Sequence, residues 1–145
     1  MNKKCRLLIC DDHADFRDLV KYALKRAPHI EVVGEAGDGQ EVVDKALKLR
    51  PDVVLMDLNM PVFTGLEATR RIKQANKRIK VLILSAFGGD DVVSPCLNAG
   101  ASGYVQKYHS FSELTQAIDA VRRGGMYLSP HAFEKVSRAN GATLE

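Results

Sequence analysis

The feature that most constrains the fold is an apolar run at residues 53–56 that ends at an acid, Asp57. A short, continuous apolar run without polar alternation is typical of a strand buried on both faces of a sheet. Pro51 precedes the run, and Asn59 and Pro61 follow it, so residues typical of loops mark both of its ends. The sequence therefore predicts a central strand of a covered sheet, with the Asp57 carboxylate at the point where burial stops.

Four further segments have the composition of strands, and three of them are also followed by polar or charged residues. The five predicted strands are residues 6–10, 30–35, 53–56, 81–84 and 102–106. Asp11 and Asp12 follow the first strand, Ser85 follows the fourth, and Lys107 follows the fifth. The same arrangement, a buried run that stops at a reactive side chain, thus occurs four times.

The intervals between these strands carry apolar residues at helical spacing, which predicts five helices. Three pairs are typical of a capping box: Asp38 with Glu41, Thr64 with Glu67, and Ser110 with Glu113. The fourth helix contains Pro95, and we expect Ser94 to cap a short helix that has Pro95 at its first position and ends at Gly100. Residues 87–91 before it are expected to form a flexible loop, and residues 132–138 a last short helix.

Five strands that alternate with five helices predict an α/β fold with a doubly wound parallel sheet. The runs at 6–10, 53–56 and 81–84 are the most apolar and belong at the centre, whereas 30–35 and 102–106 suit the two edges. This assignment gives the flavodoxin-like strand order 2-1-3-4-5. Right-handed crossovers then bring the carboxyl ends of the strands to one side, where ligands bind in folds of this class.

Composition limits the other possibilities. A length of 145 residues, 46% hydrophobic and 27% charged, suits one globular domain. The net charge is only +3, and the basic residues between 70 and 80 lack a recognition-helix pattern, so we do not expect this chain to bind DNA directly. No signal peptide or membrane span is predicted, and three cysteines without metal-site spacing indicate reduced thiols in a cytoplasmic protein.

The polar residues after the strands are expected to form one site. Taken singly, each has an ordinary explanation as a helix cap or a solvated side chain. Together, Asp11, Asp12 and Asp57 repel, because two carboxylates about 4 Å apart cost about 4 kcal/mol at an effective dielectric near 20. A divalent cation removes that repulsion, and a site made of oxygen ligands suits Mg²⁺.

In such a site Asp57 has the properties of a nucleophile that accepts a phosphoryl group. Lys107 supplies a positive charge for the phosphoryl oxygens, and the Ser85 hydroxyl and the amide of Ala86 supply donors. The four histidines share no metal-site spacing, so we expect surface or capping roles for them: His13, His29, His109 and His131.

The chain resembles the receiver domain of two-component response regulators, in the NarL/FixJ (LuxR-type) branch, whose fold is CheY-like. The resemblance covers about residues 5–130 and rests on these stretches: LLICDDH, VVLMDLNMP, VLILSA, AGASGYVQK and ELTQAIDAVRRGGMYLSP. It implies phosphoryl transfer from a sensor histidine kinase to Asp57. It further implies Mg²⁺ bound by Asp12, Asp57 and the backbone carbonyl of Asn59, with Asp11 acting through the waters of the metal.

The resemblance also assigns the switch. Ser85 and Lys107 would bind the phosphoryl group, and Tyr104 matches the aromatic residue whose ring turns when Ser85 moves. Two positions depart from the family pattern. Tyr108 follows the lysine where a proline or an acid is common, and Pro95 shortens the fourth helix, which we expect to be the least ordered one.

The resemblance suggests a receiver domain over residues 1–128 and a linker or tail over 129–145. In this branch the linker leads to a helix-turn-helix effector domain, so DNA would be bound only through a domain absent from this chain. Phosphorylation would control homodimerisation and transcription, and the chain would catalyse only its own phosphorylation and dephosphorylation. The cognate kinase, the target genes and the dimer surface are not encoded in any motif.

Three other functions use a similar fold or similar chemistry. A stand-alone CheY-like signalling adaptor without DNA-binding output has the same site and stays open. A haloacid-dehalogenase-like phosphatase needs two acids separated by one residue after the first strand, and Asp11-Asp12-His13 lacks that spacing. A flavodoxin needs phosphate-cradling donors after the first strand, where this chain carries acids.

Overall fold

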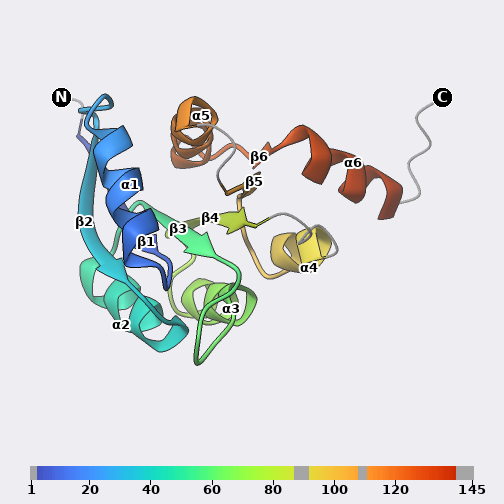
Figure 1. The fold of residues 1–145 in the computed structure, drawn as a ribbon. Helices are drawn as coiled ribbons and strands as arrows, with labels where there is room; N and C mark the ends of the chain where they lie inside the picture. The colour runs from blue at the N-terminus through green and yellow to red at the C-terminus, as the bar shows by residue number, and fades with distance from the viewer. Residues whose placement is uncertain (1–2, 87–91, 108–110, 140–145) are drawn as a thin grey trace.

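The computed structural model describes residues 3–86, 92–107 and 111–139, and in these ranges one parallel sheet lies between two layers of helices (Figure 1). The strand order is 2-1-3-4-5-6, which confirms the predicted order and adds one strand. The strands are β1 (Cys5–Cys10), β2 (Ile30–Ala36), β3 (Val53–Asp57), β4 (Lys80–Ser85), β5 (Gly103–Gln106) and β6 (Tyr127–Leu128). The helices are α1 (Ala14–Leu24), α2 (Gly39–Leu49), α3 (Gly65–Ala75), α4 (Val93–Asn98), α5 (Phe111–Arg122) and α6 (Pro130–Ala139).

Alternation along the strands divides the apolar side chains between two cores. In β1, Leu7 and Ile9 pack with α1 and α5 on one face, while Leu8 and Cys10 pack with α2, α3 and α4 on the other. Figure 1 shows the same division, with α1 and α5 above the sheet and α2 and α3 below it. Because both faces are covered, the central strands are apolar at nearly every position, as the unbroken run in β3 predicted.

Two of the three predicted capping boxes place helix starts as expected. The Asp38 carboxylate accepts the backbone N–H of Glu41 at 2.8 Å, and the Thr64 hydroxyl accepts that of Glu67 at 3.2 Å. The third pair includes Ser110, which lies outside the described residues, as does the loop predicted at 87–91. Among the described helices, none is long and apolar enough to cross a membrane.

Helix α4 begins earlier than predicted. It spans Val93–Asn98 with Val92 at the N-cap, so Ser94 lies inside the helix and Pro95 at its third position instead of its first. Proline is tolerated there because the first four backbone N–H groups of a helix have no partner within the helix. The helix is nevertheless short, as expected, with six residues.

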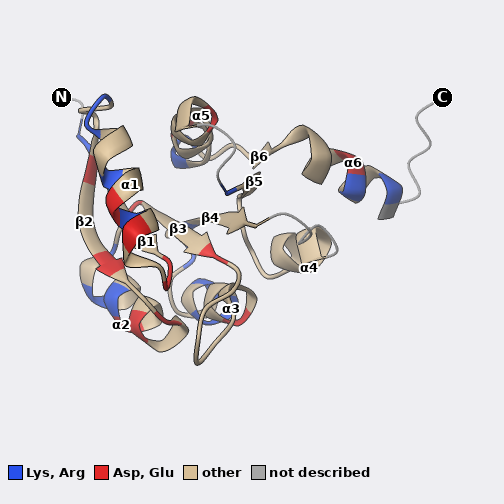
Figure 2. Cartoon of the chain, viewed as in Figure 1, with Lys and Arg blue, Asp and Glu red and all other residues tan. Residues whose placement is uncertain are grey.

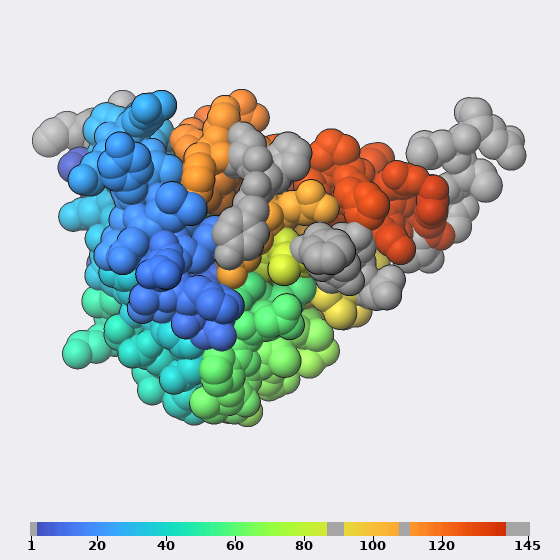
Figure 3. All heavy atoms as spheres, in the orientation of Figure 1, coloured from blue at the N-terminus to red at the C-terminus, as the bar shows by residue number. Residues whose placement is uncertain are grey.

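The prediction that the fifth strand lies at an edge was wrong. Strand β6 pairs in parallel with β5 through Gly103–Tyr127 and Tyr104–Leu128, so β5 has a neighbour on both sides. Two residues are too few for a periodic pattern, which is why the sequence did not predict this strand. Helix α6 follows directly, contacts α4, and projects from the body of the molecule (Figure 3).

Candidate functional site

The polar residues that follow the strands meet at one end of the sheet. Asp11 follows β1, Asp57 and Ser85 end β3 and β4, and Lys107 follows β5. Backbone hydrogen bonds extend the strand pairing to these residues: the N–H of Asp11 donates to Ala36 at 3.0 Å, and that of Lys107 to Ser85 at 2.8 Å. Figure 2 shows the acids near the ends of β1 and β3 and a basic residue at the end of β5. The predicted convergence is confirmed.

Lys107 lies between two buried acids. Its ammonium nitrogen is 2.6 Å from Oδ2 of Asp11 and 3.9 Å from Oδ2 of Asp57. The side chains of Lys107, Asp11 and Asp57 are at most 4% exposed. The ammonium group also lies 4.5 Å from the centre of the Phe16 ring, where a cation is attracted by the ring face. Lys107 is thus buried and oriented, and it compensates part of the negative charge of the site.

Asp57 is harder to ionise than an ordinary aspartate. Burial and the neighbouring Asp11 charge raise the pKa of Asp57 to about 6, against the opposing effects of Lys107 and of a hydrogen bond from the backbone N–H of Asn59. A carboxyl group with this pKa is still mostly ionised at neutral pH, so it keeps the lone pairs of a nucleophile. Its raised pKa shows that the site favours a neutralising partner for Asp57.

Asp11 and Asp12 form a cluster with His13. One donor atom from each of the three residues lies within 4.8 Å of the others, and Asp57 is not part of this group. Sequence reasoning assigned His13 a surface or capping role. The residue is indeed at the N-cap of α1, but its side chain makes no capping hydrogen bond, and Nδ1 lies 3.1 Å from a carboxylate oxygen of each acid. Its position directly after the acidic pair was the signal available in the sequence.

The donor set of this cluster fits a divalent cation. Asp11 is fully buried and Asp12 is 31% exposed, so the carboxylates offer oxygen ligands that remain open to solvent on one side. Mg²⁺ prefers such oxygens and keeps several of its waters. Asp11 and Asp12 form the acidic cluster that is typical of a receiver's Mg²⁺ site. The role of the Asn59 backbone carbonyl as a metal ligand stays a prediction.

The turn after β3 is held by a close approach of α3. The N–H of Gly65 donates to Leu58 at 2.8 Å, and a Cβ atom on Gly65 would lie 2.3 Å from the carbonyl oxygen of Asp57. No real Cβ fits at that distance, so glycine is needed here. The start of α3 therefore fixes the backbone that carries the Asp57 carboxylate.

Arg17 supports the acidic turn after β1, a contact that sequence reasoning missed. From α1, its Nη1 donates to the carbonyl oxygen of Asp11 at 2.5 Å, and its Nε donates to Glu35 of β2 at 3.0 Å. Lys21 pairs with the same Glu35 carboxylate at 2.7 Å. Because Arg17 and Glu35 are 18 residues apart in the chain, no local motif indicates the pair.

The two residues expected to form the switch are both buried. The Ser85 hydroxyl donates to the carbonyl oxygen of Ala86 at 2.8 Å. Tyr104 is 1% exposed and packs in the core beside α4, with Val93 and Cys96. Tyr104 is therefore fully buried, and its strand is not at an edge because β6 pairs with β5. Its role in switching stays a prediction.

Comparisons with known proteins agree with this geometry. The family described as the response regulator receiver domain matches residues 7–119. The transcriptional regulatory protein DegU of Brevibacillus brevis is 42% identical over 127 residues, which is 88% of this chain and 54% of DegU. The transcriptional regulatory protein LiaR of Bacillus subtilis is 40% identical over 131 residues, 90% of this chain and 62% of LiaR. The chain thus spans little more than half the length of these relatives.

A solved structure extends the agreement to the fold. The LuxR-family two-component response regulator from Aurantimonas sp. SI85-9A1 superposes with a TM-score of 0.89 at 34% identity, over 96% of this chain and 99% of that one. The matched family consists of regulatory domains and not of conventional enzymes. The chain therefore belongs to the response regulator receiver domains, among relatives of the NarL/LuxR type.

Proposed function

We propose that this chain is the phosphoacceptor domain of a response regulator and that Asp57 accepts a phosphoryl group from a sensor histidine kinase. The observation that carries the proposal is the buried Asp57 carboxylate at the end of β3, 3.9 Å from the Lys107 ammonium group and beside the Asp11–Asp12 cluster. A nucleophile, a cation and a cluster of oxygen ligands are the parts that phosphoryl transfer needs.

In the transfer, a carboxylate oxygen of Asp57 attacks phosphorus on the phosphohistidine of the kinase. The new O–P bond forms as the N–P bond breaks, and the imidazole leaves with the electron pair of that bond. Asp57 is ready for attack at neutral pH because its pKa of about 6 leaves it mostly ionised. The product is a mixed anhydride, which water hydrolyses back to Asp57 and phosphate.

The remaining residues bind the transferred group. Lys107 exchanges part of its contact with Asp11 for the phosphoryl oxygens, and it is already between the two acids. Ser85 turns its hydroxyl from the carbonyl of Ala86 toward the phosphoryl group. Asp12, Asp57 and the Asn59 carbonyl would hold Mg²⁺, with Asp11 acting through its waters, and the bound ion would offset the negative charge of the incoming phosphoryl group.

We propose that Tyr104 transmits the phosphorylation of Asp57 to the surface of the domain. Its ring lies in the core beside α4, so a shift of Ser85 and of the adjoining segment changes the packing against that helix. The surface formed by α4, β5 and α5 would change with it and control homodimerisation. In this structure the Tyr104 ring is already buried. Phosphorylation is therefore expected to stabilise the buried position of the ring and not to produce a new one.

The proposed role in transcription rests on the likeness to regulatory proteins. DegU and LiaR are transcriptional regulatory proteins. By likeness to them we propose that residues 1–128 are the receiver and 129–145 a linker toward an effector domain that binds DNA, with the kinase as partner in the cytoplasm. Helix α6 would then join the receiver to that domain, since it contacts α4.

The test is a titration with beryllofluoride, which mimics the phosphoryl group, in the presence of Mg²⁺. We expect backbone chemical shifts to change at Asp57, Ser85 and Lys107 and, through packing, at Tyr104, and sedimentation to show a dimer. The Asp57→Asn variant should show neither change. Shifts that stay constant in the unmodified protein, or that persist in Asp57→Asn, would overturn the proposal.

A further inference from the structure

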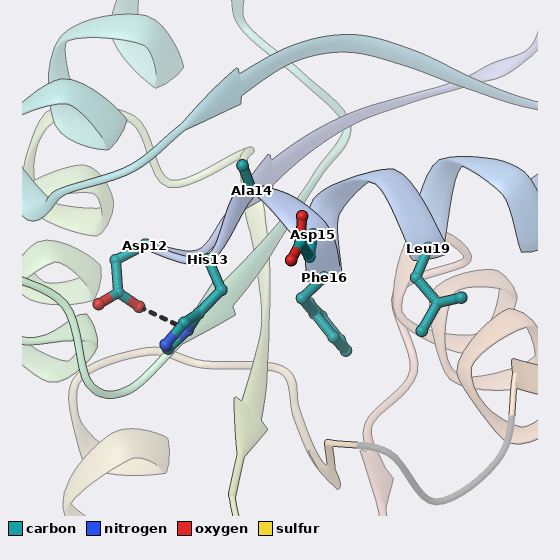
Figure 4. A pocket seen from close by; sticks show the side chains of 6 residues that line it. All are labelled: Asp12, His13, Ala14, Asp15, Phe16 and Leu19. Atoms are coloured by element: carbon teal, nitrogen blue, oxygen red, sulfur yellow. Dashed lines mark ion pairs between the residues drawn. The ribbon is translucent and has the colours of Figure 1, made fainter.

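His13 lines a surface depression beside the proposed cation site. The depression has a volume of about 560 Å³ and is lined by Asp12, His13, Ala14, Asp15, Phe16 and Leu19. Figure 4 shows the Asp12 carboxylate and the His13 ring turned toward each other, with the Asp15 carboxylate apart from them. The ring is 65% exposed, so it is held by its contacts with the acids and not by burial.

The two oxygens of Asp11 face different partners. Oδ2 lies 2.6 Å from the Lys107 ammonium group, whereas Oδ1 lies 3.1 Å from Nδ1 of His13. Oδ1 also accepts the backbone N–H of His13 at 2.8 Å, which fixes the orientation of this carboxylate. Lys107 therefore compensates one oxygen of Asp11 and leaves the other directed at the cluster.

The distances among the cluster atoms suit adjacent ligands of one ion. Nδ1 of His13 lies 3.1 Å from Oδ1 of Asp11 and 3.1 Å from Oδ1 of Asp12. Two neighbouring ligands of an octahedral ion, each bound at about 2.1 Å, are about 3 Å apart. Nδ1 of His13 thus lies at the spacing of a neighbouring ligand from Asp12, and the donor atoms of all three residues lie within 4.8 Å of one another.

We propose that His13 Nδ1 is a direct ligand of the cation site, which then binds divalent first-row transition ions such as Mn²⁺ through this nitrogen together with its oxygen ligands. The inference rests on the cation site of the proposed function. Carboxylates suit Mg²⁺ and Mn²⁺, whereas imidazole suits transition ions and adds little to Mg²⁺. His13 thereby favours transition ions over Mg²⁺ in this chain.

The simplest alternative is that the ring only hydrogen-bonds to the two acids. The His13→Asn variant separates the two possibilities, because asparagine can still hydrogen-bond to the acids but carries no imidazole nitrogen. His29→Asn is the matched control. His29 is also exposed and also pairs with an acid, Asp119, at 2.9 Å, and it precedes β2 at the opposite end of the sheet.

The experiment uses Mn²⁺ as the probe and pulsed electron paramagnetic resonance as the readout. We expect the unmodified protein and His29→Asn to show coupling of bound Mn²⁺ to ¹⁴N, replaced by ¹⁵N coupling when the histidines are ring-labelled, and His13→Asn to lose it. The Mn²⁺ affinity of His13→Asn should fall about tenfold. Its Mg²⁺ affinity should change by less than about twofold, because Mg²⁺ relies on oxygen ligands.

Absence of histidine nitrogen coupling in the unmodified protein, or an equal loss of Mn²⁺ and Mg²⁺ affinity in His13→Asn, would overturn the inference. The first outcome does not depend on whether the variant folds. Asp12→Asn separates this failure from failure of the proposed function. If Asp12→Asn leaves Mg²⁺ binding unchanged, the cation site itself is wrong, whereas weakened Mg²⁺ binding without nitrogen coupling refutes only the role of His13.

Discussion

At residue 57, burial and the negative charge of Asp11 act in the same direction on one carboxyl group. Both raise the pKa of Asp57, to about 6, so the folded protein holds this proton at pH values where the unfolded chain has lost it. The folded state then binds more protons than the unfolded state between about pH 4 and pH 6, and the free energy of unfolding falls as the pH rises through that range. The ionised nucleophile is therefore a destabilising group at neutral pH.

Replacing Asp57 by asparagine should stabilise the protein without Mg²⁺. We expect the free energy of unfolding at pH 7 to rise by about 1 to 2 kcal/mol, after allowing for solvent screening at the open end of the sheet. Denaturant titrations in EDTA at pH 4 and pH 7 would measure it. The gain should shrink at pH 4, where Asp57 is protonated in the folded state. Asp44→Asn, on an exposed position of α2, is the control and should show no such gain. An Asp57→Asn variant no more stable than this control at pH 7 would contradict the account.

At the scale of elements, Arg17 connects α1, β2 and the turn after β1. We expect Arg17→Gln to lower the free energy of unfolding by about 1 to 3 kcal/mol, because the buried carbonyl of Asp11 loses its charged donor. Mg²⁺ affinity should fall as well, since the turn carries Asp11 and Asp12. Denaturant titration and calorimetric Mg²⁺ binding measure the two effects.

Two comparisons sharpen the Arg17 prediction. Arg26→Gln, at an exposed position just after α1, should change neither stability nor Mg²⁺ affinity. Combining Arg17→Gln with Glu35→Gln should cost less than the sum of the two single changes, because the residues share one contact. Hydrogen bonds from Lys21 and, to a lesser extent, from Arg17 lower the pKa of Glu35. The stability that Glu35 contributes is therefore present above the pKa that Glu35 has in the unfolded chain, and it is lost as the pH falls through the pKa of the folded state. Full additivity would contradict the proposed link.

Helix α4 should be the least ordered of the helices. It has six residues, no side-chain cap, and a proline in its first turn, so few backbone hydrogen bonds hold it. Native-state amide exchange should be faster across residues 92–97 than across α2 or α3. Protection equal to that of those helices would show that packing of Val93 and Cys96 compensates for the short length.

The sequence predicts an element well when the pattern that defines it is local. The buried run of β3 and the boxes at Asp38 and Thr64 lie within a few residues, and the structure confirms them. Helix α4 begins two residues earlier than predicted, because a proline fits several positions of the first turn of a helix and Pro95 does not fix the start. Strand β6 was missed because its pairing with β5, and not its composition, makes it a strand.

The same distinction applies to the candidate site. Asp11, Asp57, Ser85 and Lys107 could be found because each follows a recognisable strand and the topology gathers strand ends. The Arg17–Glu35 pair could not, because its two residues are 18 positions apart and no spacing in the sequence indicates their contact. His13 directly follows the acidic pair in the sequence, but the direction of its ring is set only by folding.

At the scale of the whole molecule, one end of the sheet carries the charges and the far side of β5 carries the connection to α6. Asp57 ends β3 and Tyr104 lies in β5, with β4 between these two strands. Tyr104 packs in the core beside α4, which contacts α6. A change at Asp57 therefore has a continuous packed route to the C-terminal helix. This arrangement supports the proposal that the receiver acts on a segment that follows it.

The most direct test of the central claim is the intact mass of the protein after incubation with acetyl phosphate. We predict that Mg²⁺ leads to the gain of one phosphoryl group, that EDTA prevents it, and that Asp57→Asn abolishes it while the control Asp44→Asn does not. A mass that stays unchanged with Mg²⁺, or a gain that persists in Asp57→Asn, would contradict the assignment of Asp57 as the phosphoacceptor.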